Sequence, residues 1–115
     1  MVYQMNRGDV FMANLDPTIG AEVNKTRPVL IISNNANNKH STIVTAIPIT
    51  SNITKVYPFE VFLDKKESGL PKISKVQCNQ IRSIDKNRII KNRIGHLNNS
   101  LLQKVKAALL LHFGF

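Results

Sequence analysis

The sequence predicts a mainly β protein, a small barrel or strongly bent sheet with one C-terminal α-helix packed against it. Short runs rich in aliphatic and β-branched residues recur along the chain, and Gly, Pro and Asn separate them at close spacing. Only the last segment changes to helical periodicity. Because 115 residues bury one core but not two, we expect a single domain over residues 1–115.

The predicted strands follow the apolar runs. Residues 9–15 form the first strand, and their nearly continuous apolar character indicates that both faces meet protein, one of them at the core and the other at a candidate subunit interface. Further strands are predicted over residues 29–33, 42–49, 59–63 and 74–81. Residues 34–39 and 65–72 are polar or charged and are predicted as turns. A short helical turn over 83–88 and another short strand within 89–97 complete the sheet.

The spacing of the apolar residues changes to a helical period at Asn99. Ser100 is placed to cap a helix, with Gln103 three residues later, and Gly114 ends it. Between these positions the apolar residues recur at helical spacing, and two further leucines near the end widen the apolar arc. Such a helix is covered on more than one side, and the periodicity leaves open whether its own barrel or a second subunit covers it.

Composition restricts the function classes. Sixteen Lys and Arg against seven Asp and Glu give a net charge of +9, which predicts attraction to polyanions, although charge also serves solubility. The single cysteine, Cys78, excludes an internal disulfide and a cysteine-based zinc site. His40, His96 and His112 lack ligand spacing, so we expect no metal and no cofactor.

The N-terminal residues lack the apolar core of a signal peptide. No apolar run approaches the length that crosses a bilayer. We therefore expect a cytoplasmic protein that makes no membrane contact.

The most informative stretch is residues 15–33, LDPTIGAEVNKTRPVLIIS. It joins a polar loop to four consecutive aliphatic residues, which predict a buried strand and hence a rigid base for the loop. Pro28 fixes the backbone just before the strand and presents Arg27 at its mouth. We therefore expect the loop to carry residues of the functional site.

Several motifs occur in an order that resembles the MazF/PemK/Kid family of toxin endoribonucleases: RGDV at residues 7–10, the stretch above, AIPITS at 46–51, a GL turn, and QIRSIDK at 80–86. The similarity covers residues 7–111. It implies an SH3-like barrel of the MazF, Kid and CcdB type and a homodimer with RNA bound across its face. It also implies a cognate antitoxin with an acidic segment, with which such toxins bind DNA.

RNA cleavage without a metal requires a cation for the charged phosphorane as well as a proton acceptor and donor. Arg27 is the candidate cation because a guanidinium donates paired hydrogen bonds to phosphate oxygens and stays protonated. The resemblance implies that Thr50 pairs with it at the scissile phosphate. Outside the family, Arg27 would be interpreted as a structural arginine and Thr50 as an ordinary strand-end cap.

Other polar residues are candidates for substrate binding. Glu22 is predicted to orient Arg27 through a charge-assisted bond. In the alternating run 74–80, Lys75, Gln77 and Asn79 point away from Val76 and Cys78, toward a groove in which polar side chains read unpaired bases. Where this chain has Gln77 and Asn79, Kid-like members have a catalytic Arg and Asp, so we assign both to binding. The full predicted substrate-binding set is Thr18, Glu22, Lys25, Thr26, Ser51, Gln77, Asn79 and Gln80.

The sequence therefore predicts a metal-independent, sequence-preferring endoribonuclease of a toxin–antitoxin pair that leaves 2′,3′-cyclic phosphate and 5′-hydroxyl ends on single-stranded RNA. Two alternatives remain at this stage. One is a non-catalytic toxin that inhibits DNA gyrase, as CcdB-like relatives do, and the other is a plain nucleic-acid-binding barrel. Neither alternative has use for a phosphate-gripping Arg27 and Thr50 pair.

Overall fold

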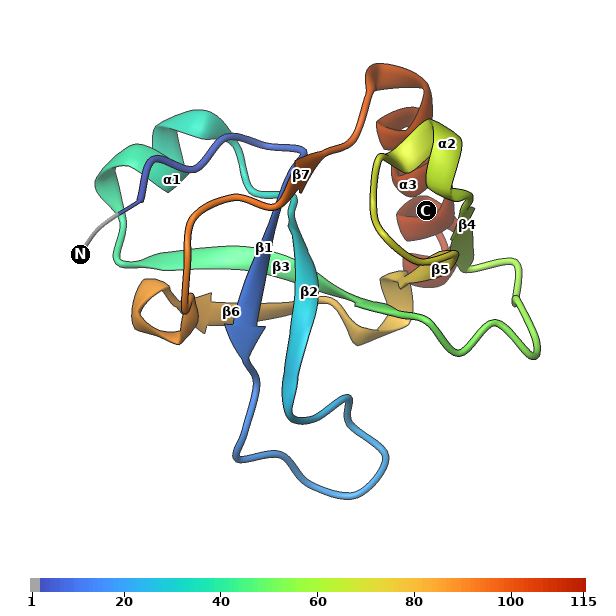
Figure 1. Cartoon of the computed structure of the whole chain (residues 1–115), viewed down its shortest axis with the longest axis horizontal. Coiled ribbons are helices and arrows are strands. Elements are labelled where there is room, and N and C mark those ends of the chain that lie inside the picture. The colour runs from blue at the N-terminus through green and yellow to red at the C-terminus, as the bar shows by residue number, and fades with distance from the viewer. Residues whose placement is uncertain (1–2) are drawn as a thin grey trace.

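Strand β3 (Ile43–Thr50) organises the sheet in the computed structural model, which describes residues 3–115. Its first half pairs with β6 (Arg82–Asp85), its middle with β2 (Thr26–Ile31) and its last two residues with β5 (Ser74–Gln77), all antiparallel. Because one strand serves partners on both sides along its length, the sheet curls around it (Figure 1). The mainly β prediction with a C-terminal helix is confirmed.

The remaining elements extend this sheet on both sides. The strand order is β4-β5-β3-β2-β1-β7, with β6 off this path on β3. The other strands and helices are β1 (Asp9–Asn14), α1 (Asn35–His40), β4 (Glu60–Leu63), α2 (Lys65–Ser68), the 3-10 turns η1 (Cys78–Gln80) and η2 (Lys86–Arg88), β7 (Gly95–His96) and α3 (Asn99–Phe113).

Both faces of the central strands are buried, as their continuous apolar sequence predicts. Alternate residues of β2 enter two separate core clusters: Leu30 packs with the cluster under α3, whereas Val29 and Ile31 pack with the cluster on the other face. The second face of β1 was expected to be a candidate subunit interface. It is instead covered by this chain's own Leu15 and Ile84.

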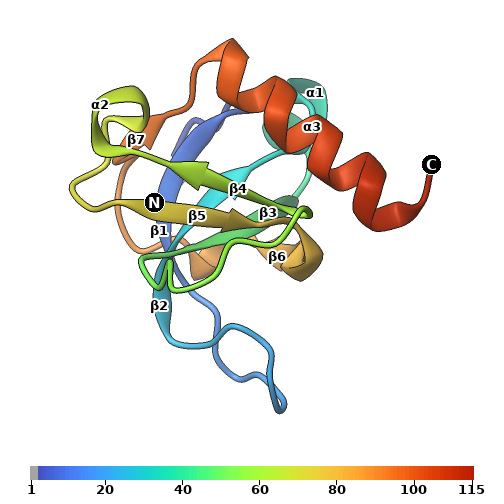
Figure 2. The same cartoon turned by 90° about the vertical axis from the view of Figure 1, so that its right-hand side faces the viewer.

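Helix α3 lies across the side of the sheet formed by β4 and β5, and its C-terminal end projects beyond the sheet (Figure 2). Gly114 ends the helix in the left-handed conformation, as predicted. The predicted N-cap is wrong, because the side chain of Asn98, two residues before Ser100, accepts the hydrogen bond from Leu101 N at 2.9 Å. None of the helices in residues 3–115 is long and apolar enough to cross a bilayer.

Four predicted turns or strands differ from the structure, wholly or in part. Residues 34–39, expected to be a turn, form α1, because the Asn34 side chain caps it at Asn37 N. The first half of residues 65–72 forms α2, which Asp64 caps and Gly69 ends. The strand predicted over 74–81 stops at Gln77 and turns into η1. Of the helical turn predicted over 83–88, residues 83–85 instead pair with β3 as part of β6, and residues 86–88 form η2.

The loop between β1 and β2 extends away from the body in both views (Figures 1 and 2). Hydrogen bonds close its base: Lys25 N donates to Asp16 Oδ1 at 3.1 Å, Leu15 N donates to Lys25 O at 3.0 Å, and Arg88 Nη1 donates to Asp16 O at 2.6 Å. Lys25 itself has a positive φ of 66°, which non-glycine residues adopt rarely. The loop therefore enters β2 with a fixed geometry, directly before Arg27.

Candidate active site

Arg27 lies near the start of β2, half-buried, opposite Ala13 of β1. Its Nε donates to the Asn24 carbonyl at 3.0 Å, which fixes the side chain over the end of the loop. Its Nη1 approaches Thr50 Oγ1 at 3.5 Å, the long end of hydrogen-bond distance. The guanidinium is thus held by one edge, which leaves other N–H groups of the fork available to a ligand.

Thr50 ends β3 and has only 8% of its surface exposed. Its Oγ1 accepts from Asn52 N at 3.2 Å as well as facing Arg27, so the hydroxyl caps the strand end and also meets the guanidinium. The strand-end cap expected of Thr50 is thus present beside the approach to Arg27, and its contact with the scissile phosphate stays a prediction. The two predicted catalytic residues, 23 positions apart in the chain, come together because β2 and β3 are neighbouring strands.

A cleft of about 570 Å³ opens beside Arg27. Thr26, Arg27 and Ser51, three of the predicted site residues, line it. Its floor is apolar, and Lys72 and Lys91 contribute two further cations. Sequence reasoning missed these two lysines. They stand in charged loops without motif character, and only the packing of distant segments brings them to this cleft.

The predicted site residues in the loop between β1 and β2 lie in different environments. Thr18 is half-buried and Lys25 is exposed. Glu22 does not orient Arg27 as expected: its Oε1 accepts from Ile19 N at 2.7 Å and thereby closes a turn of its own loop. The backbone carbonyl of Asn24 takes the orienting role instead.

The structure also departs from the simple alternation predicted for the polar residues of 74–80. Lys75 is buried, and its ammonium group bonds Glu60 Oε1 at 2.9 Å and the Lys55 carbonyl at 2.6 Å, so it faces the interior and not a groove. Gln77 is half-buried, and its Oε1 has no hydrogen-bond partner within the described residues. Asn79 is exposed in η1. Gln80 Oε1 accepts from Val23 N at 3.4 Å and so supports the loop from below.

Cys78 is fully buried behind these residues. Desolvation by burial, with a smaller contribution from the charge of Glu60, raises the pKa of its thiol from 9.0 to about 12. A thiol that stays protonated is a poor nucleophile. The interpretation of Cys78 as a small buried hydrophobe agrees with this environment.

The histidines lie away from the cleft. His96 Nδ1 meets Asp9 Oδ1 at 2.8 Å and joins β7 to β1, and His112 lies among aromatic rings near the end of α3. His40 is exposed at the end of α1. Within residues 3–115, no three His, Cys, Asp or Glu side chains gather where they could hold a metal ion.

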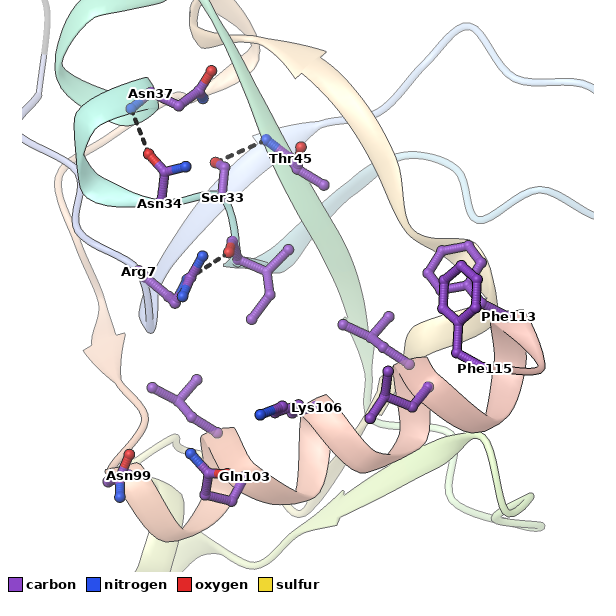
Figure 3. Close-up of a pocket in the computed structure, with 14 residues that line it drawn as sticks. Arg7, Ser33, Asn34, Asn37, Thr45, Asn99, Gln103, Lys106, Phe113 and Phe115 are labelled. Atoms are coloured by element: carbon purple, nitrogen blue, oxygen red, sulfur yellow. Dashed lines mark hydrogen bonds between the residues drawn. The ribbon is translucent and has the colours of Figure 1, made fainter.

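A second, larger cavity of about 760 Å³ lies between α3 on one side and Ile32, just after β2, and Thr45 of β3 on the other (Figure 3). Arg7 reaches into it and donates from Nε to the Ile32 carbonyl at 2.8 Å. The helix contributes mainly apolar side chains, including Phe113, beside the one cation Lys106. This cavity is lined by more aromatic and leucine side chains than the Arg27 cleft, and both have basic residues but no carboxylate among their described lining residues.

Comparisons with known proteins agree with the motifs. The family model described as PemK-like, MazF-like toxin of type II toxin-antitoxin system matches residues 6–113. Endoribonuclease MazF9 of Mycobacterium tuberculosis is 40% identical over 113 residues, which cover 94% of this chain and 95% of the relative.

Solved structures are similar in fold and in sequence. MazF from Deinococcus radiodurans superposes with a TM-score of 0.84 at 28% identity, covering 100% of this chain and 99% of the relative. The MazE-MazF structure of the same organism matches with a TM-score of 0.78 at 28% identity, over 98% of each chain. One of these relatives is thus MazF alone and the other is MazF in a MazE-MazF structure.

Proposed function

This chain belongs to the family of PemK-like, MazF-like toxins of type II toxin-antitoxin systems, and on that premise we propose that it is an endoribonuclease in which Arg27 and Thr50 act on the cleaved phosphodiester. The observation that carries the assignment is the approach of Arg27 Nη1 to Thr50 Oγ1 at 3.5 Å, beside an open cleft. A guanidinium and a hydroxyl at that separation can hydrogen-bond two oxygens of one phosphate.

The proposed reaction is an attack by the ribose 2′-hydroxyl on the adjacent phosphorus. The new P–O2′ bond forms as the P–O5′ bond breaks, the 2′-hydroxyl loses its proton, and the leaving O5′ gains one. The products are a 2′,3′-cyclic phosphate and a 5′-hydroxyl. Arg27 stabilises the negative charge on the phosphorane, and Thr50 hydrogen-bonds the same group or relays a proton.

End mapping tests this proposal. Purified protein is incubated with long single-stranded RNA in EDTA, and the ends are identified chemically. We expect cleavage with cyclic-phosphate ends at a preferred sequence, and loss of cleavage in Arg27→Ala. An absolute requirement for Mg²⁺ would contradict the mechanism, and equal cleavage by Arg27→Ala would contradict the assignment of the site.

The proposed substrate contacts lie around the cleft. Thr26 and Ser51 line it, and Thr18, Glu22 and Lys25 belong to the loop that borders it. Single-stranded RNA fits a site of this kind, because its unstacked bases offer edges to polar side chains. Gln77, Asn79 and Gln80 would supply amide groups for such contacts.

The cognate partner of this toxin is an antitoxin, since the family is defined by toxin–antitoxin pairs and a relative is known in a MazE-MazF structure. We expect an acidic segment of that antitoxin to cover the Arg27 cleft, because the chain carries a net charge of +9 and the cleft has no carboxylate among its described lining residues. Such a segment would compete directly with RNA.

A homodimer belongs to the same proposal. The end of α3 exposes Leu110, Leu111, Phe113 and Phe115 at 42%, 58%, 53% and 92%, a concentration of apolar surface beside the cavity of Figure 3. A second copy of the chain would cover it. The finer features proposed with it are an SH3-like barrel, one domain over residues 1–115, and action in the cytoplasm, where mRNA is found.

Two other functions are not favoured. A gyrase-inhibiting toxin of the CcdB type or a plain nucleic-acid-binding barrel would not require Arg27 and Thr50 to meet. The 40% identical relative is named an endoribonuclease. The family membership therefore agrees with the catalytic assignment.

A further inference from the structure

Two lysines that no motif singled out share the cleft with Arg27. Lys72 lies in the turn between α2 and β5, and Lys91 lies in the segment between η2 and β7. Within the part of the chain that the structure describes, no Asp or Glu lines this cleft. Three basic residues therefore line one cleft that has no carboxylate among its described lining residues.

Packing fixes the two segments that carry these lysines against each other. Leu70 is buried and packs so closely on Gly95 that a Cβ at Gly95 would lie 3.1 Å from Leu70 Cδ2. Only glycine allows this approach without displacement of Leu70. The turn before β5 and the segment before β7 are thereby held at one end of the cleft.

Backbone and side-chain hydrogen bonds hold each segment in place. Ser74 Oγ donates to the Lys72 carbonyl at 2.9 Å. On either side of Lys91, Ile90 N donates to Met12 O at 3.0 Å and Ile94 N donates to Val10 O at 2.8 Å, so β1 supports the segment. The lysine Cα positions are thus fixed, and only the side chains remain to adapt to a ligand.

The ammonium groups themselves are free. In residues 3–115, neither Lys72 Nζ nor Lys91 Nζ donates a hydrogen bond or joins an ion pair. Lys75 and Lys86 provide the contrast, since their ammonium groups are bound to the carbonyls of Lys55 and Asn38 at 2.6 Å each. The fold therefore uses two lysines as internal supports and leaves two at the cleft with their full hydrogen-bonding capacity.

We propose that Lys72 and Lys91 form a subsite for a backbone phosphate of the RNA that flanks the cleaved bond. This inference rests on the proposed endoribonuclease function and adds a second phosphate contact to it. Arg27 and Thr50 grip the bond that breaks, whereas the two lysines hold the strand on one side of it. Ammonium groups on flexible stems suit this role, because they bind phosphate as point charges without reading the base.

Salt dependence provides the quantitative signature. Each phosphate contact to a single strand adds about 0.7 to the slope of log affinity against log salt concentration. Loss of this one phosphate contact should lower the slope by about 0.7, so that between about 50 and 200 mM salt the wild type loses about 2.6-fold more affinity than the variant. The kcat at saturating RNA should stay within about twofold of the wild type, because the lysines do not touch the reacting atoms.

The first experiment compares Lys72→Gln/Lys91→Gln with Lys65→Gln/Lys104→Gln, which removes the same formal charge from exposed positions on α2 and α3 outside the cleft. Cleavage kinetics give KM and kcat. The Kd of an RNA with a 2′-O-methyl group at the cleavage position gives the salt slope without turnover. Circular dichroism melting checks that all variants fold.

We expect the cleft variant alone to show a raised KM and a lowered salt slope. If its slope and KM equal those of the Lys65/Lys104 control, the subsite is wrong even though the wild type cleaves RNA. If the wild type does not cleave, the endoribonuclease proposal fails, and the slopes measured with the 2′-O-methyl RNA still decide whether the two lysines bind phosphate.

A second experiment locates the phosphate. Single uncharged methylphosphonate linkages are placed in turn on each side of the cleavage position. One linkage should weaken binding by the wild type and by the Lys65/Lys104 control but leave Lys72→Gln/Lys91→Gln unaffected. An equal loss in all three proteins at every position would overturn the proposal.

Discussion

Two cavities of this protein, those of Arg27 and Arg7, are each lined by an arginine that is held in the same way. Arg27 donates from Nε to the Asn24 carbonyl, and Arg7 donates from Nε to the Ile32 carbonyl. The neighbours differ: Arg27 approaches the Thr50 hydroxyl and lines its cleft together with Lys72 and Lys91, whereas Arg7 lines a cavity to which α3 contributes Leu102, Leu109, Leu110 and Phe113 beside Lys106. We therefore expect a fixed guanidinium to serve an anion site in one case and a protein interface in the other, according to what surrounds it.

The largest expected difference between the cavities concerns catalysis. Arg27→Ala should lower kcat by about 10² to 10³, the usual cost of removing one donor that stabilises developing charge. Arg7→Ala should leave kcat nearly unchanged when the assay is run at protein concentrations well above the dimer dissociation constant. Single-turnover cleavage of RNA measures both variants. Similar losses in the two variants would remove the distinction between the cavities.

The next largest effect concerns assembly. Leu110→Glu combined with Phe113→Glu places two charges at the apolar border of the Arg7 cavity, and we expect dimerisation to weaken by at least about a hundredfold because the charges must be desolvated. Lys104→Glu, on the same helix but outside this cavity, is the control. Sedimentation equilibrium measures the dissociation constants. Unchanged dimerisation in the double variant would show that this surface has another use.

A smaller change in kcat is expected when one threonine beside each arginine is replaced. Thr50→Val keeps the shape and removes the hydroxyl, so kcat should fall by about ten- to a hundredfold, within the range for one positioned polar group. Thr45→Val in the Arg7 cavity should leave kcat unchanged. Loss of the Thr50 hydroxyl also leaves Asn52 N without its acceptor, at a cost of about 1 kcal/mol in stability. A kcat of Thr50→Val equal to that of Thr45→Val would contradict the role of Thr50.

The last prediction concerns stability rather than activity, and it tests the core that lies between the two cavities. Cys78 belongs to the cluster in which Ile49 and Leu70 border the Arg27 cleft and Leu102 and Leu109 border the Arg7 cavity. Since the pKa of its thiol is raised to about 12 in the folded protein, the unfolded chain releases this proton first as the pH rises above 9. Stability should therefore be unaffected below pH 9 and should fall above it, by about 1.4 kcal/mol per pH unit from this group.

Urea denaturation of the wild type and of Cys78→Ala isolates this contribution. The difference in unfolding free energy between them should shrink as the pH rises from 9 toward 12. A thiol reagent should also modify Cys78 only after unfolding. Rapid modification of the native protein at neutral pH would show that solvent reaches the core between the two cavities.

The sequence by itself determined the buried strands, through their apolar runs, and the terminal helix with its end at Gly114. The order of its motifs also indicated that Arg27 pairs with Thr50. These features depend on local patterns or on a resemblance carried by contiguous residues. The early end of β5 at Gln77 and the pairing of residues 82–85 with β3 were decided by tertiary structure, because strand partners outweighed short-range propensity. The helix at 35–40 depends on a local cap at Asn34, in a run of asparagines whose turn propensity had predicted no helix.

The same division holds within the candidate site. Glu22 was expected at Arg27 because it is near in sequence, yet the loop geometry turns it toward its own backbone. Lys75 was expected in a groove from strand alternation, yet Glu60 on the neighbouring strand holds it inside. Lys72 and Lys91 line one cleft although they are 19 positions apart, and the packing of Leu70 on Gly95 holds their two segments together. Contacts between residues distant in sequence depend on how whole strands and turns pack, and no local pattern in the chain records them.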